Sequence, residues 1–154
     1  MLTASWTLSL GTLTVVVCSA LCLRACICDI WRREIPNDVP VLLTLTAVVF
    51  SIADTGSVAG LSHLAWWPAA ALLAVGFALS LANIWGAGDA KLLAALALFC
   101  PNYWPDLIGL TALAGGFLAA GYLFKNRYSR NKSSTLPYGV AISCAFGILT
   151  MSTV

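Results

Sequence analysis

Long apolar segments separated by short polar breaks run the whole length of this chain. They cover roughly residues 6–28, 39–54, 65–85, 88–101, 106–124 and 136–153. A membrane-spanning helix needs about 20 apolar residues, and most of these segments approach that length. The pattern therefore predicts an all-α fold, a polytopic transmembrane helix bundle with about six spans. Segment 88–101 is the shortest, short enough to be re-entrant or buried inside the bundle, but the distribution of basic residues favours a sixth crossing.

The breaks between the segments carry residues that end and start helices. Pro36 ends the first helix at or before residue 35, because proline restricts the residue that precedes it. Asn37 then has the side chain of a helix cap for the second segment. Pro101 and Pro105 separate the fourth segment from the fifth, and residues 126–135 form a polar connector before the sixth.

The composition excludes a soluble globule. Only 9% of the 154 residues are charged and 60% are hydrophobic, whereas soluble domains carry about 25% charged residues. The length suits a single membrane-embedded domain over residues 1–154, with the lipid bilayer as its surroundings. No basic surface interleaved with aromatic residues indicates nucleic-acid binding.

The cysteines do not form a recognisable metal or redox motif. Cys18, Cys22 and Cys26 recur every four residues and so share one helix face. No C-x-x-C pair occurs, and the only histidine, His63, lies far away in the sequence. The cysteines are therefore interpreted as small packing residues, and no metal site is predicted.

The distribution of lysine and arginine predicts the orientation. With six spans and the N-terminus outside, segments 29–38, 86–91 and 125–135 face the cytoplasm. They hold seven of the eight basic residues: Arg32, Arg33, Lys91, Lys125, Arg127, Arg130 and Lys132. The eighth, Arg24, lies near the cytoplasmic end of the first helix, and the outer loops have none. This asymmetry is typical of membrane proteins, in which cytoplasmic loops are rich in lysine and arginine. Trp31 and Trp85 fall where aromatic residues mark the inner interface.

Two aspartates stand out because charge beside bilayer-length apolar segments is costly. Asp29 lies at the end of the first segment, and Asp89 follows Gly86 and Gly88 at the start of the fourth. The predicted topology places both at the same membrane depth, so helix packing could bring their carboxylates together. Paired carboxylates, one protonated and one ionised, are typical acid/base machinery.

Three stretches in order then resemble one protein family over nearly the whole chain. They are Asp29 followed by Ile35-Pro36-Asn37, then Gly86-Ala-Gly-Asp89-Ala-Lys91-Leu-Leu93, and finally Leu136-Pro137-Tyr138-Gly139-Val-Ala-Ile142. The family is the type IV prepilin peptidases, a group of membrane aspartyl proteases with a GxGD motif. The chain resembles the short form associated with Flp-type (tight-adherence) pili.

The resemblance implies that Asp29 and Asp89 form the catalytic pair. It implies hydrolysis of the leader of pilin-like precursors at the cytoplasmic face of the bacterial inner membrane, without a metal, cofactor or covalent nucleophile. Five residues would support the motifs: Gly86, Gly88, Lys91, Pro36 and Asn37. Three would line the substrate path: Pro137, Tyr138 and Gly139. The long form's extra domain, with its N-methyltransferase activity, is missing between the first two helices, so methyl transfer is not expected.

Two other functions remain open from the residues alone. The aspartates could be interfacial charges that pair with Arg32 or Lys91 in a non-catalytic subunit of a pilus or secretion assembly. Alternatively, they could relay protons in a small transporter. The absence of an evident internal repeat and the position of both aspartates near one face argue against the transporter.

Overall fold

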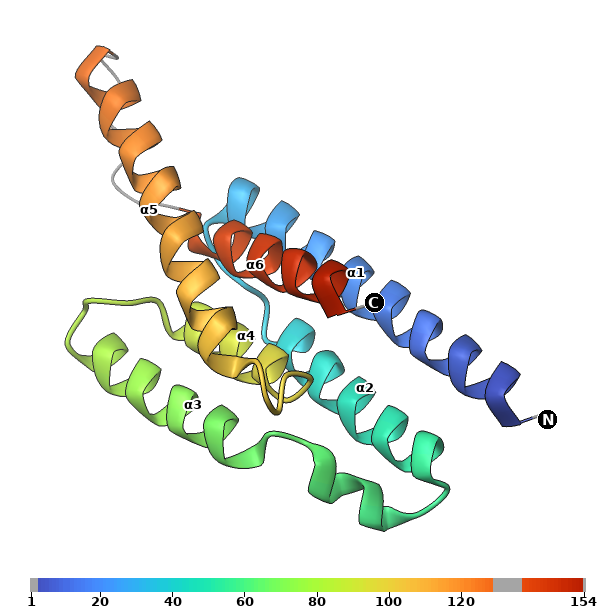
Figure 1. Cartoon of the computed structure of the whole chain (residues 1–154). Helices are drawn as coiled ribbons and strands as arrows, with labels where there is room; N and C mark the ends of the chain where they lie inside the picture. Colours follow the sequence, from blue (N-terminus) through green and yellow to red (C-terminus); the bar gives the residue numbers. More distant parts are fainter. Residues whose placement is uncertain (1–2, 129–136, 154) are drawn as a thin grey trace.

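The computed structural model describes residues 3–128 and 137–153 (Figure 1). Its elements are α1 (Thr3–Arg32), α2 (Asp38–Thr55), η1 (Val58–His63), α3 (Trp66–Leu81), α4 (Ala87–Ala97), α5 (Trp104–Tyr128) and α6 (Tyr138–Thr153). All of these elements are helical, which confirms the predicted all-α class. Arg130, Lys132 and Leu136, which entered the charge pattern and the third motif, lie outside the described residues.

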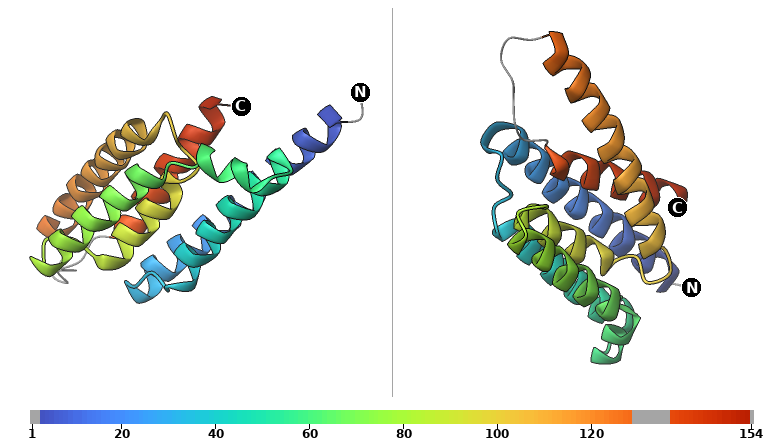
Figure 2. Two further views of the ribbon diagram at one scale, coloured as in Figure 1. Left: turned by 90° about the horizontal axis from the view of Figure 1, so that it is seen from below. Right: turned by 90° about the vertical axis from the view of Figure 1, so that its left-hand side faces the viewer.

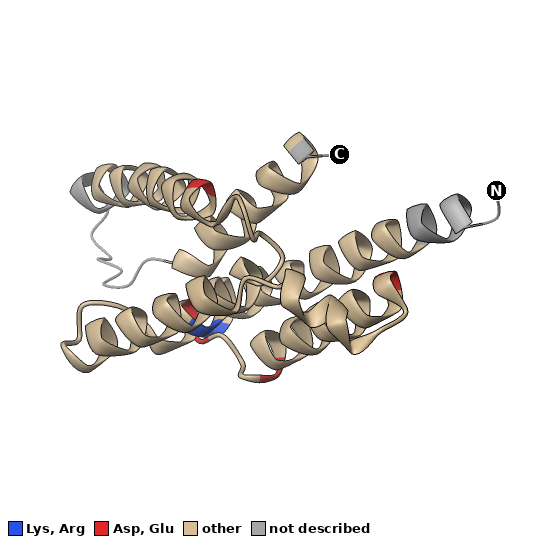
Figure 3. Cartoon of the chain, turned by 60° about the horizontal axis from the view of Figure 1, so that its bottom comes forward, with Lys and Arg blue, Asp and Glu red and all other residues tan. Residues whose placement is uncertain are grey.

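The helices have the length and composition of a membrane bundle. Three contain an apolar stretch long enough to cross a bilayer: Leu10–Arg32 in α1, Asp38–Thr55 in α2 and Trp104–Phe124 in α5. Helices α3 and α6 are shorter but equally apolar. Charged residues occupy little of the ribbon in Figure 3. These features confirm the prediction of a polytopic helical bundle.

Helix α4 lies at the centre of the bundle. It has 11 residues, which give a length of about 16 Å. It packs against α2, α3 and α6, and Leu92 and Leu96 are completely buried. The close contact with α3 depends on Gly76, because a Cβ there would collide with Ala90 of α4. The short fourth segment is therefore buried inside the bundle.

Two helices link the elements that carry the aspartates. Both α2 and α6 pack against α1 and also against α4. Figures 1 and 2 show α6 running alongside α1, and α2 running beneath α4. The largest hydrophobic core cluster joins Cys18 and Cys22 of α1 with Leu92 of α4 and Ile142 of α6. The ends of α1 and α4 are thus positioned by shared neighbours.

The turn between α1 and α2 differs in one detail from the sequence prediction. Helix α1 ends at Arg32, before Pro36 as predicted, and Arg33 has a positive φ of 58°. Asn37 precedes α2 but makes no side-chain capping hydrogen bond, so the predicted capping role is wrong. Its backbone is helical rather than extended, and its side chain accepts a hydrogen bond from Lys91 Nζ instead.

Candidate active site

Asp29 is anchored by the start of a helix far away in the sequence. It lies in the last turn of α1 and is only 6% exposed. Its Oδ2 accepts a 2.7 Å hydrogen bond from the backbone N–H of Gly139, in the first turn of α6. The unpaired N–H groups and the dipole at a helix start both favour a negative group there. Helix α6 therefore fixes the orientation of this carboxylate.

Asp89 is held by the first turn of its own helix. Gly86 is the N-cap of α4, and Asp89, three residues later, is half-buried. A Cβ at Gly86 would lie 2.8 Å from Asp89 Oδ2. The carboxylate therefore folds back over the start of α4, and a side chain at position 86 would require it to move.

One pocket brings both carboxylates together. It has a volume of about 780 Å³, and Asp29 and Asp89 both line it. Asn37, Lys91 and Tyr138 also lie on its wall. The charge of Asp29 is close enough to act on Asp89. Both side chains thus line one pocket, and their direct pairing stays a prediction. We call this pocket the acid chamber.

Ile35 explains why two further glycines are needed beside the chamber. A Cβ at Gly88 would lie 3.2 Å from Ile35 Cβ, and one at Gly139 would lie 3.0 Å from Ile35 Cδ1. The same added atom at Gly139 would lie 2.9 Å from Asp29 Oδ2. Ile35 therefore packs between the starts of α4 and α6, and a Cβ at either glycine would require Ile35 to shift by a few tenths of an ångström.

The remaining predicted site residues fall into two groups. Tyr138, Lys91 and Asn37 line the acid chamber, and Lys91 Nζ donates a 2.8 Å hydrogen bond to Asn37 Oδ1. Pro36 and Pro137 do not line it. Pro137 is buried directly before α6, and Pro36 is half-buried in the turn before α2. These two prolines shape the chain around the chamber.

Trp85 is a chamber residue that the sequence motifs did not single out. It lines the wall and meets Tyr138 in an edge-to-face contact, with ring centroids 6.2 Å apart. Its Nε1 is buried without a hydrogen-bond partner. Asn83, with a positive φ of 56°, turns the chain just before it. In the sequence, only the position of Trp85 directly before Gly86 pointed to the chamber. A tryptophan at the membrane interface explains the same position equally well.

The described residues include no grouping suited to a metal ion. Among residues 3–128 and 137–153, no three or more His, Cys, Asp or Glu side chains come together in such a group. The described chamber offers three carboxylates, those of Asp29, Glu34 and Asp89, together with the cations of Arg33 and Lys91 and several neutral polar side chains.

Comparison with known protein families places this geometry in context. Residues 16–151 match the type IV leader peptidase family. The chain belongs to that family. It is a membrane peptidase, and the matched region includes both aspartates and the start of α6. No match was found among curated proteins or among solved structures.

Proposed function

We propose that this leader peptidase is an aspartic endopeptidase with Asp29 and Asp89 as its catalytic pair. The observation that carries the proposal is that two carboxylates, from helices far apart in the sequence, line one chamber. The interfacial-charge alternative expects each aspartate to pair with a cation. The ion pair between Arg24 and Asp38 involves neither of them, and Asp29 is held by the backbone N–H of Gly139.

The proposed reaction needs one ionised and one protonated carboxyl group. Two like charges in one pocket disfavour the doubly ionised state, which leaves one proton on the pair. We assign the ionised role to Asp29, because the start of α6 favours its negative charge. Asp29 removes a proton from water as the water attacks the peptide carbon. Asp89 donates its proton to the carbonyl oxygen.

Collapse of the resulting tetrahedral intermediate completes the cycle. The C–N bond breaks as Asp29 gives the proton that it took from water to the leaving amine, and Asp89 recovers its proton from a hydroxyl group of the intermediate. Atoms and charge then balance for hydrolysis of one peptide bond, with no covalent enzyme intermediate. Gly86, Gly88 and Gly139 act as positioning residues, since each leaves space beside a catalytic carboxyl or beside Ile35.

We further propose that the substrates are Flp-type, type IV pilin-like precursors cleaved at the cytoplasmic face of the bacterial inner membrane. Arg33 and Lys91 line the acid chamber, whereas the connection 55–64 at the opposite end of α2 has no lysine or arginine. This asymmetry favours a cytoplasmic chamber. Such a precursor carries its leader ahead of an apolar helix, and we expect leader hydrolysis without methyl transfer.

Leader cleavage with matched aspartate variants tests this function. A Flp-type pilin precursor is co-expressed with wild type, Asp29→Asn, Asp89→Asn or Asp54→Asn, and the product masses are measured. Asp54 is an exposed aspartate at the far end of α2, so its variant is the control. Loss of acid/base catalysis lowers the rate by about 10²–10⁴-fold. We expect that loss in the first two variants only.

The two failure modes give different results. Cleavage at the wild-type rate by Asp29→Asn or Asp89→Asn would exclude the proposed pair. Absence of cleavage by folded wild-type enzyme, across a panel of type IV prepilins, would exclude the proposed substrate class.

A further inference from the structure

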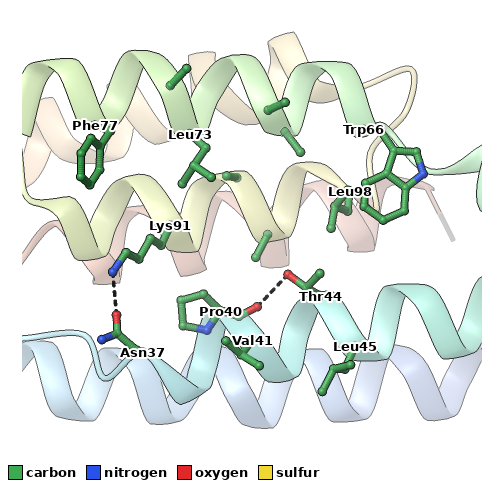
Figure 4. Close-up of a pocket in the computed structure, with 15 residues that line it drawn as sticks. Asn37, Pro40, Val41, Thr44, Leu45, Trp66, Leu73, Phe77, Lys91 and Leu98 are labelled. Carbon is green, nitrogen blue, oxygen red and sulfur yellow. Dashed lines mark hydrogen bonds between the residues drawn. The ribbon is translucent and has the colours of Figure 1, made fainter.

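A second cavity, on the side of the bundle, shares the lining residues Asn37 and Lys91 with the acid chamber. It has a volume of about 900 Å³ and lies between α2 and α3, with α4 as its floor (Figure 4). Helices α2 and α3 each pack against α4 but make few contacts with each other. We call this cavity the apolar groove, because twelve of its fifteen lining residues are apolar. Only Asn37, Thr44 and Lys91 are polar.

The shape of the groove suits a helix. Along α3 it extends from Trp66 to Phe77, which is about 16 Å or three helical turns. Small residues on its walls and floor, such as Ala70, Ala74 and Ala94, permit the close approach that membrane helices use in packing. A chain inside a bilayer must satisfy its own backbone hydrogen bonds, so a segment entering here is helical.

Asn37 and Lys91 belong to both cavities. Figure 4 shows their hydrogen bond at one end of the apolar groove, bridging from α4 to the start of α2. A segment lying in the groove therefore ends beside this pair, and the chain that continues from it enters the acid chamber. Where the segment stops being helical, its backbone groups lose their hydrogen-bond partners. The exposed Asn37–Lys91 pair provides donors and an acceptor for those groups.

We propose that the apolar groove binds the apolar helix of the precursor and that the Asn37–Lys91 pair positions the chain beyond it. This inference rests on the proposed peptidase function and adds the docking surface. A helix held by α2, α3 and α4 presents the peptide bond just outside the bilayer to Asp29 and Asp89. Asn37 and Lys91 act as positioning residues, and the groove selects precursors whose leader is followed by an apolar helix.

Filling the groove tests the proposal. Ala74 is exposed and lines the groove, so Ala74→Phe occupies its space without disturbing the core. Ala112→Phe makes the same change on an exposed face of α5, outside the groove, and is the matched control. Cleavage of a type IV pilin precursor is measured in reconstituted vesicles. We expect Ala74→Phe to raise KM about tenfold or more, from the apolar contact that it displaces, and Ala112→Phe to match wild type.

A photo-crosslinking residue locates the helix without relying on turnover. The residue replaces Leu73, which lines the groove, in an Asp89→Asn background, and Phe117 on α5 is the control position. Capture of the precursor's apolar segment from position 73 alone supports the proposal. Capture of only phospholipid or of a second enzyme copy at position 73 overturns it, as does an unchanged KM for folded Ala74→Phe. If folded wild type cleaves no prepilin, the proposed function fails, and the docking proposal fails with it.

Discussion

A methyl group added at Gly139 tests whether the contact between α1 and α6 positions a catalytic carboxylate. In Gly139→Ala the new Cβ would lie 2.9 Å from Asp29 Oδ2 and 3.3 Å from Asp29 Cγ. Ordinary van der Waals contact begins at 3.4 Å, so the carboxyl group must move by about 0.5 Å. The atom that moves belongs to the proposed catalytic residue itself, which makes the change informative.

The expected loss follows from that displacement. A misplacement of 1 Å at a reacting group can cost about 10²-fold in rate. A shift of half that size therefore predicts a fall in kcat/KM of about tenfold or more. The hydrogen bond from Gly139 N to Asp29, worth about 1.5–3 kcal/mol when intact, is weakened as well. The helix propensity of alanine exceeds that of glycine by about 0.5–1 kcal/mol and offsets part of this loss in stability.

The assay compares Gly139→Ala with Gly147→Ala in precursor cleavage and in thermal unfolding. Gly147 lies in the same helix, and a Cβ there would meet nothing within 4 Å. We expect Gly147→Ala to keep wild-type kcat/KM and Gly139→Ala to lose it while remaining folded. Equal activity of the two variants would refute the reasoning, because the carboxylate position would then not depend on α6.

Two further predictions concern stability. Gly76→Ala should lower the melting temperature, because its Cβ would collide with Ala90 and overpacking costs about 1–3 kcal/mol. Gly116→Ala meets nothing within 4 Å and serves as the control, so equal melting temperatures would contradict the close α3–α4 contact. Asp38→Asn breaks the ion pair with Arg24, but both side chains are about half exposed, so we expect a loss below about 1 kcal/mol. A larger loss in denaturant titration would show that this pair is structural.

The sequence allowed the helical elements to be predicted because membrane insertion leaves a strong one-dimensional signal. Apolar length predicted six helices, and Pro36 indicated where α1 stops. The two aspartates could be selected because charge is costly beside such segments. Their shared depth followed from counting spans, and no knowledge of packing angles was required.

The contacts that complete the site could not be predicted in the same way. The hydrogen bond from Gly139 to Asp29 joins residues 110 positions apart, and that from Lys91 to Asn37 joins residues 54 positions apart. Such pairings depend on how the helices rotate about their axes, which hydropathy does not determine. The side chain of Asn37 illustrates this point, because local sequence favoured a helix cap whereas tertiary packing brought Lys91 within reach.

The link between Asp29 and α6 has a consequence for biosynthesis. Asp29 leaves the ribosome 110 residues before the backbone group that orients it, a delay of roughly 5 to 20 s at ordinary elongation rates. Until α6 is inserted, Asp29 has no Gly139 to orient it and the wall of the chamber lacks Tyr138. With Asp29 as the proposed catalytic residue, we expect a nascent chain that lacks α6 to leave neighbouring proteins uncut during its own synthesis. The proposed pair would then become competent only when insertion of the helices is complete.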